Sequence, residues 1–470
     1  MPARNLLLLV LTTAACVAAW YAHERDRRGR RVDEVLSLID AVYIEPVDDE
    51  ALVAAALDGA VSTLDENSAW LRGDRQRELE AALDQRFGGV GLELAIDDRS
   101  GGLTVAAPLP GGPAARAGVV AGDRVLAIDG ETTAGMALRD AVALLRGEPG
   151  SAVTLSVATE GDAATDADAV AAHDVRLVRE VVQVESVEGD RRLPDGTWDW
   201  WLEGEPGVAF VRITGFGERT AAELDAAIAR VAAGQFRDAA PPVPLRGLVI
   251  DLRGNPGGLV TAAVDVCDLF LDEGVIVSTQ GRRPAGSGGA TTSQDVRRAT
   301  AGAALAGVPI AVLVDGMTAS AAEIVAACLQ DHGRGRVVGC RTYGKGTVQS
   351  IVPLAGGGLL KITTAEYLRP DGTAIDRRRD AGPDDDWGVS PDDGFTITPS
   401  SAAVERLARW RRRRESAAVV AGPPAVAPRA IDEVLARAVE AFPPGLAPAA
   451  DLGGEEEASG DAHEAAAAGA

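Results

Sequence analysis

The sequence predicts an α/β protein whose largest domain contains a mainly parallel sheet. From about residue 205 to 395, segments typical of buried strands, such as "GVAFVRI" and "VPIAVLVD", alternate with segments of helical periodicity, such as "TAAELDAAIARVAA" and "SAAEIVAACLQD". Such alternation is typical of parallel strands joined by crossover helices. The chain has 470 residues, which is enough for two to four domains with at least one sizeable core.

The composition is that of a globular protein and argues against nucleic-acid binding. Hydrophobic residues make up 46% and charged residues 25% of the chain, and the net charge is −24. The final segment, "DLGGEEEASGDAHEAAAAGA", is acidic and rich in small residues, so we expect it to be disordered. Four cysteines, one of them in an apolar N-terminal run, do not indicate a disulfide framework and therefore do not identify the compartment.

The N-terminal segment, residues 1–31, predicts a signal-anchor. Residues Asn5–Ala22 contain no charge, a length at the short limit for a membrane span and also compatible with a signal peptide. No small-x-small cleavage site is evident, so we expect a membrane-anchored protein of the cell envelope with a periplasmic catalytic domain, or a secreted one if cleavage occurs. Lipidation at Cys16 is an alternative. The topology stays open, because the arginines between Arg25 and Arg31 follow the apolar run, where they would favour the cytoplasm.

Four regions are expected after this segment. Residues 32–84 show two helical runs joined by "EPVDD", with a proline stop and acidic N-cap candidates. Residues 85–160 show short strands and one amphipathic helix, Met136–Leu145, separated by glycine-rich turns. The α/β core follows at 175–400. The last region, 401–470, is predicted to be a basic-ended helix capped near Ser400, a Pro/Ala linker, a short helix and the acidic tail.

The small domain at 85–160 resembles a PDZ domain in the order of its elements and in the phrase "AARAGVVAGDRVLAIDG". PDZ domains bind the terminal carboxylate of a peptide with the N–H groups of a glycine-containing loop, and the peptide adds as a strand. The resemblance places this loop in "GVGLEL", at Val90, Gly91 and Leu92. The alternative is a glycine-rich strand entry that binds nothing.

A candidate nucleophile lies in "VPIAVLVDGMTASAAEIVAACLQDHGRG". A strand ends at Asp315, a tight turn follows, and a helix begins near Ser320, so the hydroxyl lies where a helix offers free N–H groups and a positive dipole. The N–H of Ser320 or Ala321 would then bind an oxyanion. The alternative is an ordinary helix cap, in which Ser320 and Glu323 form a capping box.

The base that this serine needs is predicted to be a lysine. Of the four histidines only His332 is near in sequence, and twelve helical residues place it roughly 18 Å from Ser320. Lys345 is one of two lysines in an arginine-rich chain, the other being Lys361, and only lysine can act as a neutral amine. It follows the next predicted strand, which returns to the same sheet edge. Gln349, four residues later, could orient the amine.

A second oxyanion donor is expected in "DLRGNPGGL". This glycine turn between a strand and a helix could direct an amide into the site, with Gly257 the preferred donor and Gly258 the next choice. The alternative is a turn whose glycines serve tight packing alone.

Taken together, these motifs resemble the C-terminal processing (tail-specific) protease family over roughly residues 32–395. The resemblance includes "LDENSAWL", "GLVIDLRGNPGGL", "RTYGKGTVQ" and the 25-residue interval from Ser320 to Lys345. It implies that Ser320 is the nucleophile, Lys345 the general base and Gln349 its positioning residue, with Gly257 and the amide of Ala321 as the oxyanion hole. It also implies a crotonase-like α/β core with an inserted PDZ domain. "LDENS", where the family commonly has Pro-His, and the acidic "GPDDDWGVSPDDG" are departures.

The predicted function is therefore that of a serine endopeptidase that cleaves proteins near apolar C-termini through an acyl-enzyme. We expect no cofactor and no metal. The expected partners are proteins or peptides with apolar C-termini and the membrane, and a homo-oligomer is left open. Two alternatives remain: a peptide-binding scaffold that has lost catalysis, and a crotonase-like acyl-CoA enzyme.

Overall fold

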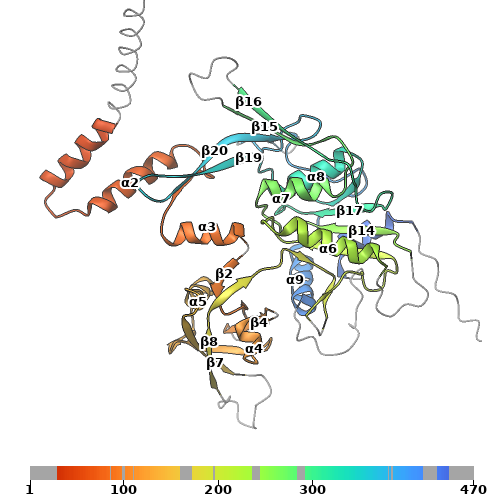
Figure 1. Ribbon diagram of the computed structural model, residues 1–470, viewed down its shortest axis with the longest axis horizontal. Helices are drawn as coiled ribbons and strands as arrows, with labels where there is room; N and C mark the ends of the chain where they lie inside the picture. Colours follow the sequence, from red (N-terminus) through yellow and green to blue (C-terminus); the bar gives the residue numbers. More distant parts are fainter. Residues whose placement is uncertain are drawn as a thin grey trace, which may run out of the picture. The chain divides into compact units, whose positions relative to one another are not determined.

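The computed structural model describes residues 29–443 apart from 85, 98–100, 110, 159–171, 194–195, 235–243, 283–291, 379, 383–384 and 416–430. It divides into two compact units. Figure 1 labels many of the helices and strands named below. One consists of residues up to 80 with 279–294 and 347–366, and the other contains the rest. The predicted anchor up to residue 28, the linker and the acidic tail lie outside the described residues. Among the residues described, no helix has the length and apolarity needed to cross a membrane.

The first unit contains the predicted helical region up to residue 80 and most of one sheet. A helix at 29–42 precedes α2 (Asp49–Ser62), whose N-cap Asp48 accepts the N–H of Glu50 at 3.0 Å, as the "EPVDD" join predicted. In "LDENS", Asp65 accepts the N–H groups of Asn67 and Ser68, so this departure forms its own turn. The strands that build the sheet run in the order β1-β20-β15-β16, with β19 beside β20. They are β1 (Ala69–Leu71), β15 (Val275–Arg282), β16 (Thr292–Arg298), β19 (Thr347–Pro353) and β20 (Leu359–Leu368). Residues 275–278 of β15, 295–298 of β16 and 367–368 of β20 belong to the second unit.

The PDZ-like domain is a small sheet closed by two helices around its own apolar core. Its strands are β3 (Leu92–Ile96), β4 (Leu103–Pro108), β5 (Arg124–Ile128), β6 (Glu131–Thr132), β7 (Ala152–Ala158) and β8 (His173–Val178). Its helices are α4 (Pro113–Arg116) and α5 (Leu138–Leu145). β8 pairs with β7, so this sheet includes residues up to 178. A separate ribbon follows, in which β2 (Arg86–Gly89) pairs with β9 (Glu180–Gln183).

The core domain contains the predicted parallel sheet. Its strand order is β10-β13-β14-β17-β18, with β10 antiparallel and the other four parallel. The strands are β10 (Val187–Glu188), β13 (Val208–Ile213), β14 (Gly247–Asp251), β17 (Ile310–Val314) and β18 (Gly335–Gly339). The connecting helices are α6 (Thr220–Ala232), α7 (Val260–Asp268) and α8 (Ala321–Asp331). β14 and β17 are buried along their whole length, and their carboxyl ends carry the candidate site.

Two C-terminal helices pack on this core. They are α9 (Ser401–Glu415), where the Ser400 hydroxyl accepts the Ala403 N–H, as predicted, and α11 (Glu433–Glu440), which lies against β14, β17 and β18. The N-cap of α11, Asp432, is buried and pairs with Arg253, which follows β14. The C-terminal helix is thereby tied to the strand end that leads into the glycine turn.

Candidate active site

Ser320 lies where β17 leads into α8, on a turn whose backbone is held by buried polar groups. The Thr318 hydroxyl donates to the Leu252 carbonyl at 2.9 Å, and the Asp315 carboxylate accepts the N–H groups of Met317 and Thr318. Ser320 has φ 57° and ψ −118°. Glycine adopts this conformation readily, but residues with a side chain rarely do. We name residues 315–320 the serine turn.

Glu323 joins the serine turn to the segment that contains Lys345. Its Oε2 accepts the backbone N–H of Ser320 and that of Lys345, each at 2.8 Å. Its Oε1 accepts the Gly344 N–H at 2.7 Å and the Thr342 hydroxyl at 2.5 Å. The carboxylate is fully buried, and this burial raises its pKa although its hydrogen bonds act in the opposite direction. The two predicted catalytic residues are therefore neighbours, because one carboxylate oxygen binds both of their amides.

The Lys345 segment is fixed on its outer side by residues from the predicted acidic insertion. The Trp387 ring lies between the guanidinium groups of Arg341 and Arg377, at 4.8 and 4.6 Å from its centroid. A Cβ on Gly344 would come within 2.7 Å of the Trp387 ring, so only glycine fits there. Lys345 itself is half-buried. This packing restrains the backbone on which the lysine is carried.

The glycine turn, residues 254–258, approaches Ser320 directly. A Cβ on Gly257 would lie 2.8 Å from the Ser320 Cβ and 3.0 Å from the Ala321 nitrogen. The buried Asn255 side chain accepts the Gly257 N–H at 2.8 Å and donates to the Ile213 carbonyl at 2.7 Å. Gly257 is thus needed for space beside Ser320, and its amide is already paired.

Two other amides remain open beside Ser320. The Ser320 N–H is bound by Glu323, whereas the Ala321 N–H at the start of α8 has no acceptor in the described part of the chain. The Gly258 N–H likewise has none among those residues. The Gly257 carbonyl accepts the Phe216 N–H at 2.9 Å. This carbonyl and the Gly258 N–H belong to one peptide group, and in a trans peptide the two point in opposite directions. The Gly258 N–H is therefore directed away from Phe216.

Two further residues were considered from the sequence, Gln349 and His332. Gln349 belongs to the other compact unit, on β19, where its side-chain amide donates to the Thr347 hydroxyl at 2.9 Å. His332 caps the far end of α8, and its Nε2 lies 2.7 Å from the Val275 carbonyl oxygen, so it has a structural partner. Among the described residues, no group of three or more His, Cys, Asp or Glu is arranged to hold a metal ion.

The loop predicted to bind a peptide C-terminus borders a small cavity in the PDZ-like domain. Gly89–Leu92 form one side of this cavity of about 90 Å³, and Val142, Leu145 and Arg146 form the other. A longer groove of about 470 Å³ continues between Leu92–Ile96 and the residues Leu138 and Val142 of α5. Its lining is apolar apart from Glu93. A strand added beside β3 would place alternate side chains over this surface.

Sequence reasoning missed several residues that shape the site. Glu323 was considered only as part of a helix cap, although it also binds the Lys345 segment. Asn255, Trp387 and Asp432 were not singled out. Asn255 and Trp387 lie within motifs that were quoted, "RGNPGG" and "DDDWGVS", so a polar or aromatic side chain among glycines was the available signal.

Comparison with known proteins places the chain in a family. The model of peptidase family S41 matches residues 207–393, and a PDZ-domain model matches residues 104–159. A carboxy-terminal-processing protease from Bartonella bacilliformis is 35% identical over 347 residues, 73% of this chain and 72% of that protein. The carboxy-terminal processing protease CtpA of Bacillus subtilis is 28% identical over 377 residues, 80% of this chain and 72% of that protein. A solved structure, photosystem II D1 C-terminal processing protease, is 27% identical and covers 79% of this chain and 92% of its own, with a TM-score of 0.41. The chain therefore belongs to the carboxy-terminal processing proteases of peptidase family S41, serine peptidases that carry a PDZ domain.

Proposed function

We propose that Ser320 and Lys345 form the catalytic dyad of this peptidase. The observation that supports the pairing best is the Glu323 carboxylate, which binds the amides of both residues with one oxygen. In the first step the neutral Lys345 amine takes the Ser320 proton as Oγ attacks the substrate carbonyl. The lysine then donates this proton to the departing amine, which leaves an acyl-enzyme. Water, deprotonated by the same amine, releases the acyl group and restores Ser320.

The oxyanion hole in this proposal is formed by the N–H groups of Gly258 and Ala321. Both lack an acceptor among the described residues, whereas the Gly257 amide donates to Asn255 and the Ser320 amide to Glu323. An amide that is free in the ground state can bind the developing charge without first breaking a hydrogen bond. Asn255 is the positioning residue of this hole. Its side chain accepts the Gly257 N–H and so fixes the backbone immediately before the Gly258 amide.

Further parts of the proposal rest on the family resemblance and, for the anchor, on the uncharged run Asn5–Ala22. The core is crotonase-like, Gln349 positions the Lys345 amine, and the PDZ-like groove captures an apolar C-terminus of a protein substrate. Residues 1–31 anchor the protein in the cell envelope with the catalytic domain outside the cytoplasm. The groove beside β3 supports the substrate class, because seven of the eight residues that line it have apolar side chains.

The dyad is tested with the full chain and its Ser320→Ala and Lys345→Arg variants. Arginine keeps the positive charge of lysine but cannot deprotonate, so we expect Lys345→Arg to lose turnover and fluorophosphonate labelling as completely as Ser320→Ala while circular dichroism stays unchanged. The substrates are a polypeptide with an apolar C-terminus and the same polypeptide with a charged one. Turnover by Lys345→Arg at the wild-type rate would refute the dyad. Equal cleavage of both substrates would refute the recognition of apolar tails.

A further inference from the structure

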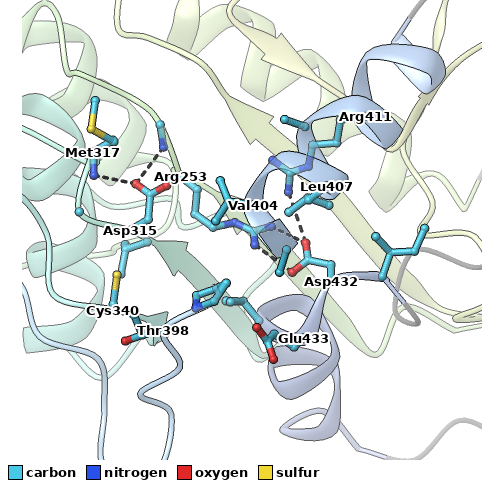
Figure 2. A pocket seen from close by; sticks show the side chains of 18 of the residues that line it. Arg253, Asp315, Met317, Cys340, Thr398, Val404, Leu407, Arg411, Asp432 and Glu433 are labelled. Carbon is cyan, nitrogen blue, oxygen red and sulfur yellow. Dashed lines mark hydrogen bonds and ion pairs between the residues drawn. The ribbon is translucent and has the colours of Figure 1, made fainter. Parts of the chain in front are cut away.

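A cavity of about 490 Å³ lies beside the two catalytic turns (Figure 2). The glycine turn contributes Gly254 to its wall, and the serine turn contributes Asp315, Gly316 and Met317. The same two turns carry Gly258 and Ser320 a few residues later. The cavity and Ser320 are therefore connected through both turns.

The opposite wall is the apolar face of α9. The cavity is lined by four residues that lie on one face of this helix, Ala403, Val404, Leu407 and Ala408. Residues 431–434, where the last helical region begins, close one end of the cavity. Figure 2 shows Met317 and Asp315 on one side and Val404, Leu407 and Arg411 on the other. Met317 is 66% exposed, which is unusual for a large apolar side chain three residues from a nucleophile.

Most charged groups of the lining, with the exception of the exposed Glu433, have partners within the protein. Arg253 binds Asp432 at 2.7 Å, and Arg411 also pairs with this carboxylate. Arg212 pairs with Glu415 at 2.6 Å. The Asp315 carboxylate accepts the N–H groups of Gly254, Met317 and Thr318, two of them in its own turn. A charged side chain that entered would lose hydration and have to compete with these pairs, whereas an apolar one would gain contact with both walls.

We propose that this cavity is a substrate subsite that receives a large, uncharged apolar side chain of the polypeptide close to the scissile bond. The inference rests on the proposed peptidase function and is separate from C-terminal recognition by the PDZ-like groove. It assigns a specificity role to α9, which lies beyond residues 207–393 matched by the peptidase model. The volume lies in the range of sites that bind small organic groups.

The experiment compares the full chain with its Ala408→Trp and Ala402→Trp variants. Ala408 lines the cavity, and Ala402 lies on the same helix, is exposed and is not part of the lining. The substrates are internally quenched peptides with one apolar C-terminus and with Leu, Ala, Lys or Glu at each position flanking the scissile bond. We expect the wild type and Ala402→Trp to cleave the Leu peptide at least about tenfold faster in kcat/KM than the Ala peptide at one position. Ala408→Trp fills the cavity, so this preference should disappear.

Binding and labelling separate failure of the subsite from failure of the peptidase. The same peptides are titrated against Ser320→Ala with and without Ala408→Trp, and fluorophosphonate labelling reports Ser320 independently of the cavity. A Leu preference in binding that is lost with Ala408→Trp supports the subsite even where turnover is absent. No preference for Leu at any position, a preference for Lys or Glu, or an Ala408→Trp variant that keeps the full Leu preference would overturn it. Absence of labelling in the wild type would instead refute the peptidase proposal.

Discussion

The PDZ-like loop and the serine and glycine turns are each proposed to bind a negatively charged group with backbone N–H groups, but different atoms hold the two regions in place. In the PDZ-like loop the carbonyls of Val90 and Gly91 accept the N–H groups of Ala114 and Leu109, at 3.0 and 2.9 Å. These are backbone contacts within one small domain. The loop is therefore defined mainly by its glycine and by the strand that follows it.

The catalytic turns depend instead on buried side chains. Glu323 and Asn255 each bridge two segments that are distant in sequence, and both are fully buried. A buried polar group without its partner costs more than the hydrogen bond contributed. The comparison therefore predicts that single side-chain changes disable the catalytic turns, whereas the PDZ-like loop responds chiefly to changes of its backbone conformation.

The largest effect is expected from Glu323→Gln. The amide of Gln can accept on one side only, so its NH₂ group must face either the N–H groups of Ser320 and Lys345 or the N–H of Gly344. Donors then oppose donors in a dry site, and the two catalytic residues move apart. We expect kcat to fall about 1,000-fold, the size of the loss when a transition-state donor is removed.

A matched control for this variant is Thr342→Val, which removes one of the four donors to Glu323 and leaves the amides of Ser320 and Lys345 bound. We expect a loss of about tenfold or less for Thr342→Val. Steady-state kinetics and circular dichroism are measured on both proteins. Activity of Glu323→Gln within tenfold of the wild type, in a folded protein, would show that Glu323 is not required to align the dyad.

The next largest effect concerns stability and its dependence on pH. Burial alone would raise the pKa of Asp432, but the Arg253 guanidinium and its hydrogen bond lower it overall. A carboxyl whose folded pKa is depressed stabilises the fold above its unfolded pKa, about 4, and this contribution is lost as the pH falls. We expect Asp432→Asn to lower the free energy of unfolding by about 3 kcal/mol near neutral pH.

Denaturant unfolding of the wild type and of Asp432→Asn, from pH 7 down to pH 3, checks this prediction. The difference between the two proteins should shrink as the pH falls below about 4, because the wild-type carboxyl becomes protonated. A difference that grows on acidification would contradict the sign. Glu440→Gln, at an exposed ion pair of α11, is the control and should change the free energy of unfolding by less than about 1 kcal/mol.

A smaller effect is expected at the PDZ-like loop, from Gly91→Ala. Gly91 has φ +70°, and a Cβ there would lie 3.3 Å from the Gly112 Cα, so alanine strains the loop and moves its amides. We expect a peptide with an apolar C-terminus to bind about tenfold more weakly, measured by fluorescence anisotropy on the full chain carrying Ser320→Ala. Gly101 has a similar positive φ, +66°, and a Cβ there would meet nothing within 4 Å. The Gly101→Ala variant should therefore bind the peptide normally. Equal affinities for Gly91→Ala and Gly101→Ala would exclude this loop as the carboxylate site.

The comparison also explains how much could be predicted from the sequence. The strand, turn and helix around Ser320 were predicted because β17 is a continuous apolar run that ends at Asp315, and a serine with Glu three residues later begins α8. The approach of the Lys345 segment followed from the return of β18 to the same sheet edge. These are local or topological signals, which periodicity and capping rules capture.

The contacts that complete the site could not be predicted in the same way. Asn255 binds the Ile213 carbonyl, and Trp387 packs over Gly344, so each contact joins segments about 40 residues apart. The pairing of β8 could not be predicted for a similar reason. The strand at His173–Val178 has no local feature that tells whether it pairs with β7 or with the core sheet.

The smallest predicted effect tests the strain at Ser320 itself. Its φ of 57° and ψ of −118° match the first central position of a type II′ turn, which glycine strongly favours. Backbone strain at this position should destabilise the alanine variant by about 1–3 kcal/mol. The glycine variant avoids this strain but loses more chain entropy on folding, which costs less than about 1 kcal/mol. We therefore expect Ser320→Gly to be more stable than Ser320→Ala by about 1 kcal/mol. Neither variant has a hydroxyl, so the difference isolates the backbone. Denaturant unfolding of the two proteins at one pH measures it, and equal stabilities would mean that the serine turn holds no strain. A positive difference would mean that the hydrogen bonds of Glu323 and Asn255 hold the nucleophile in a conformation that its own backbone disfavours.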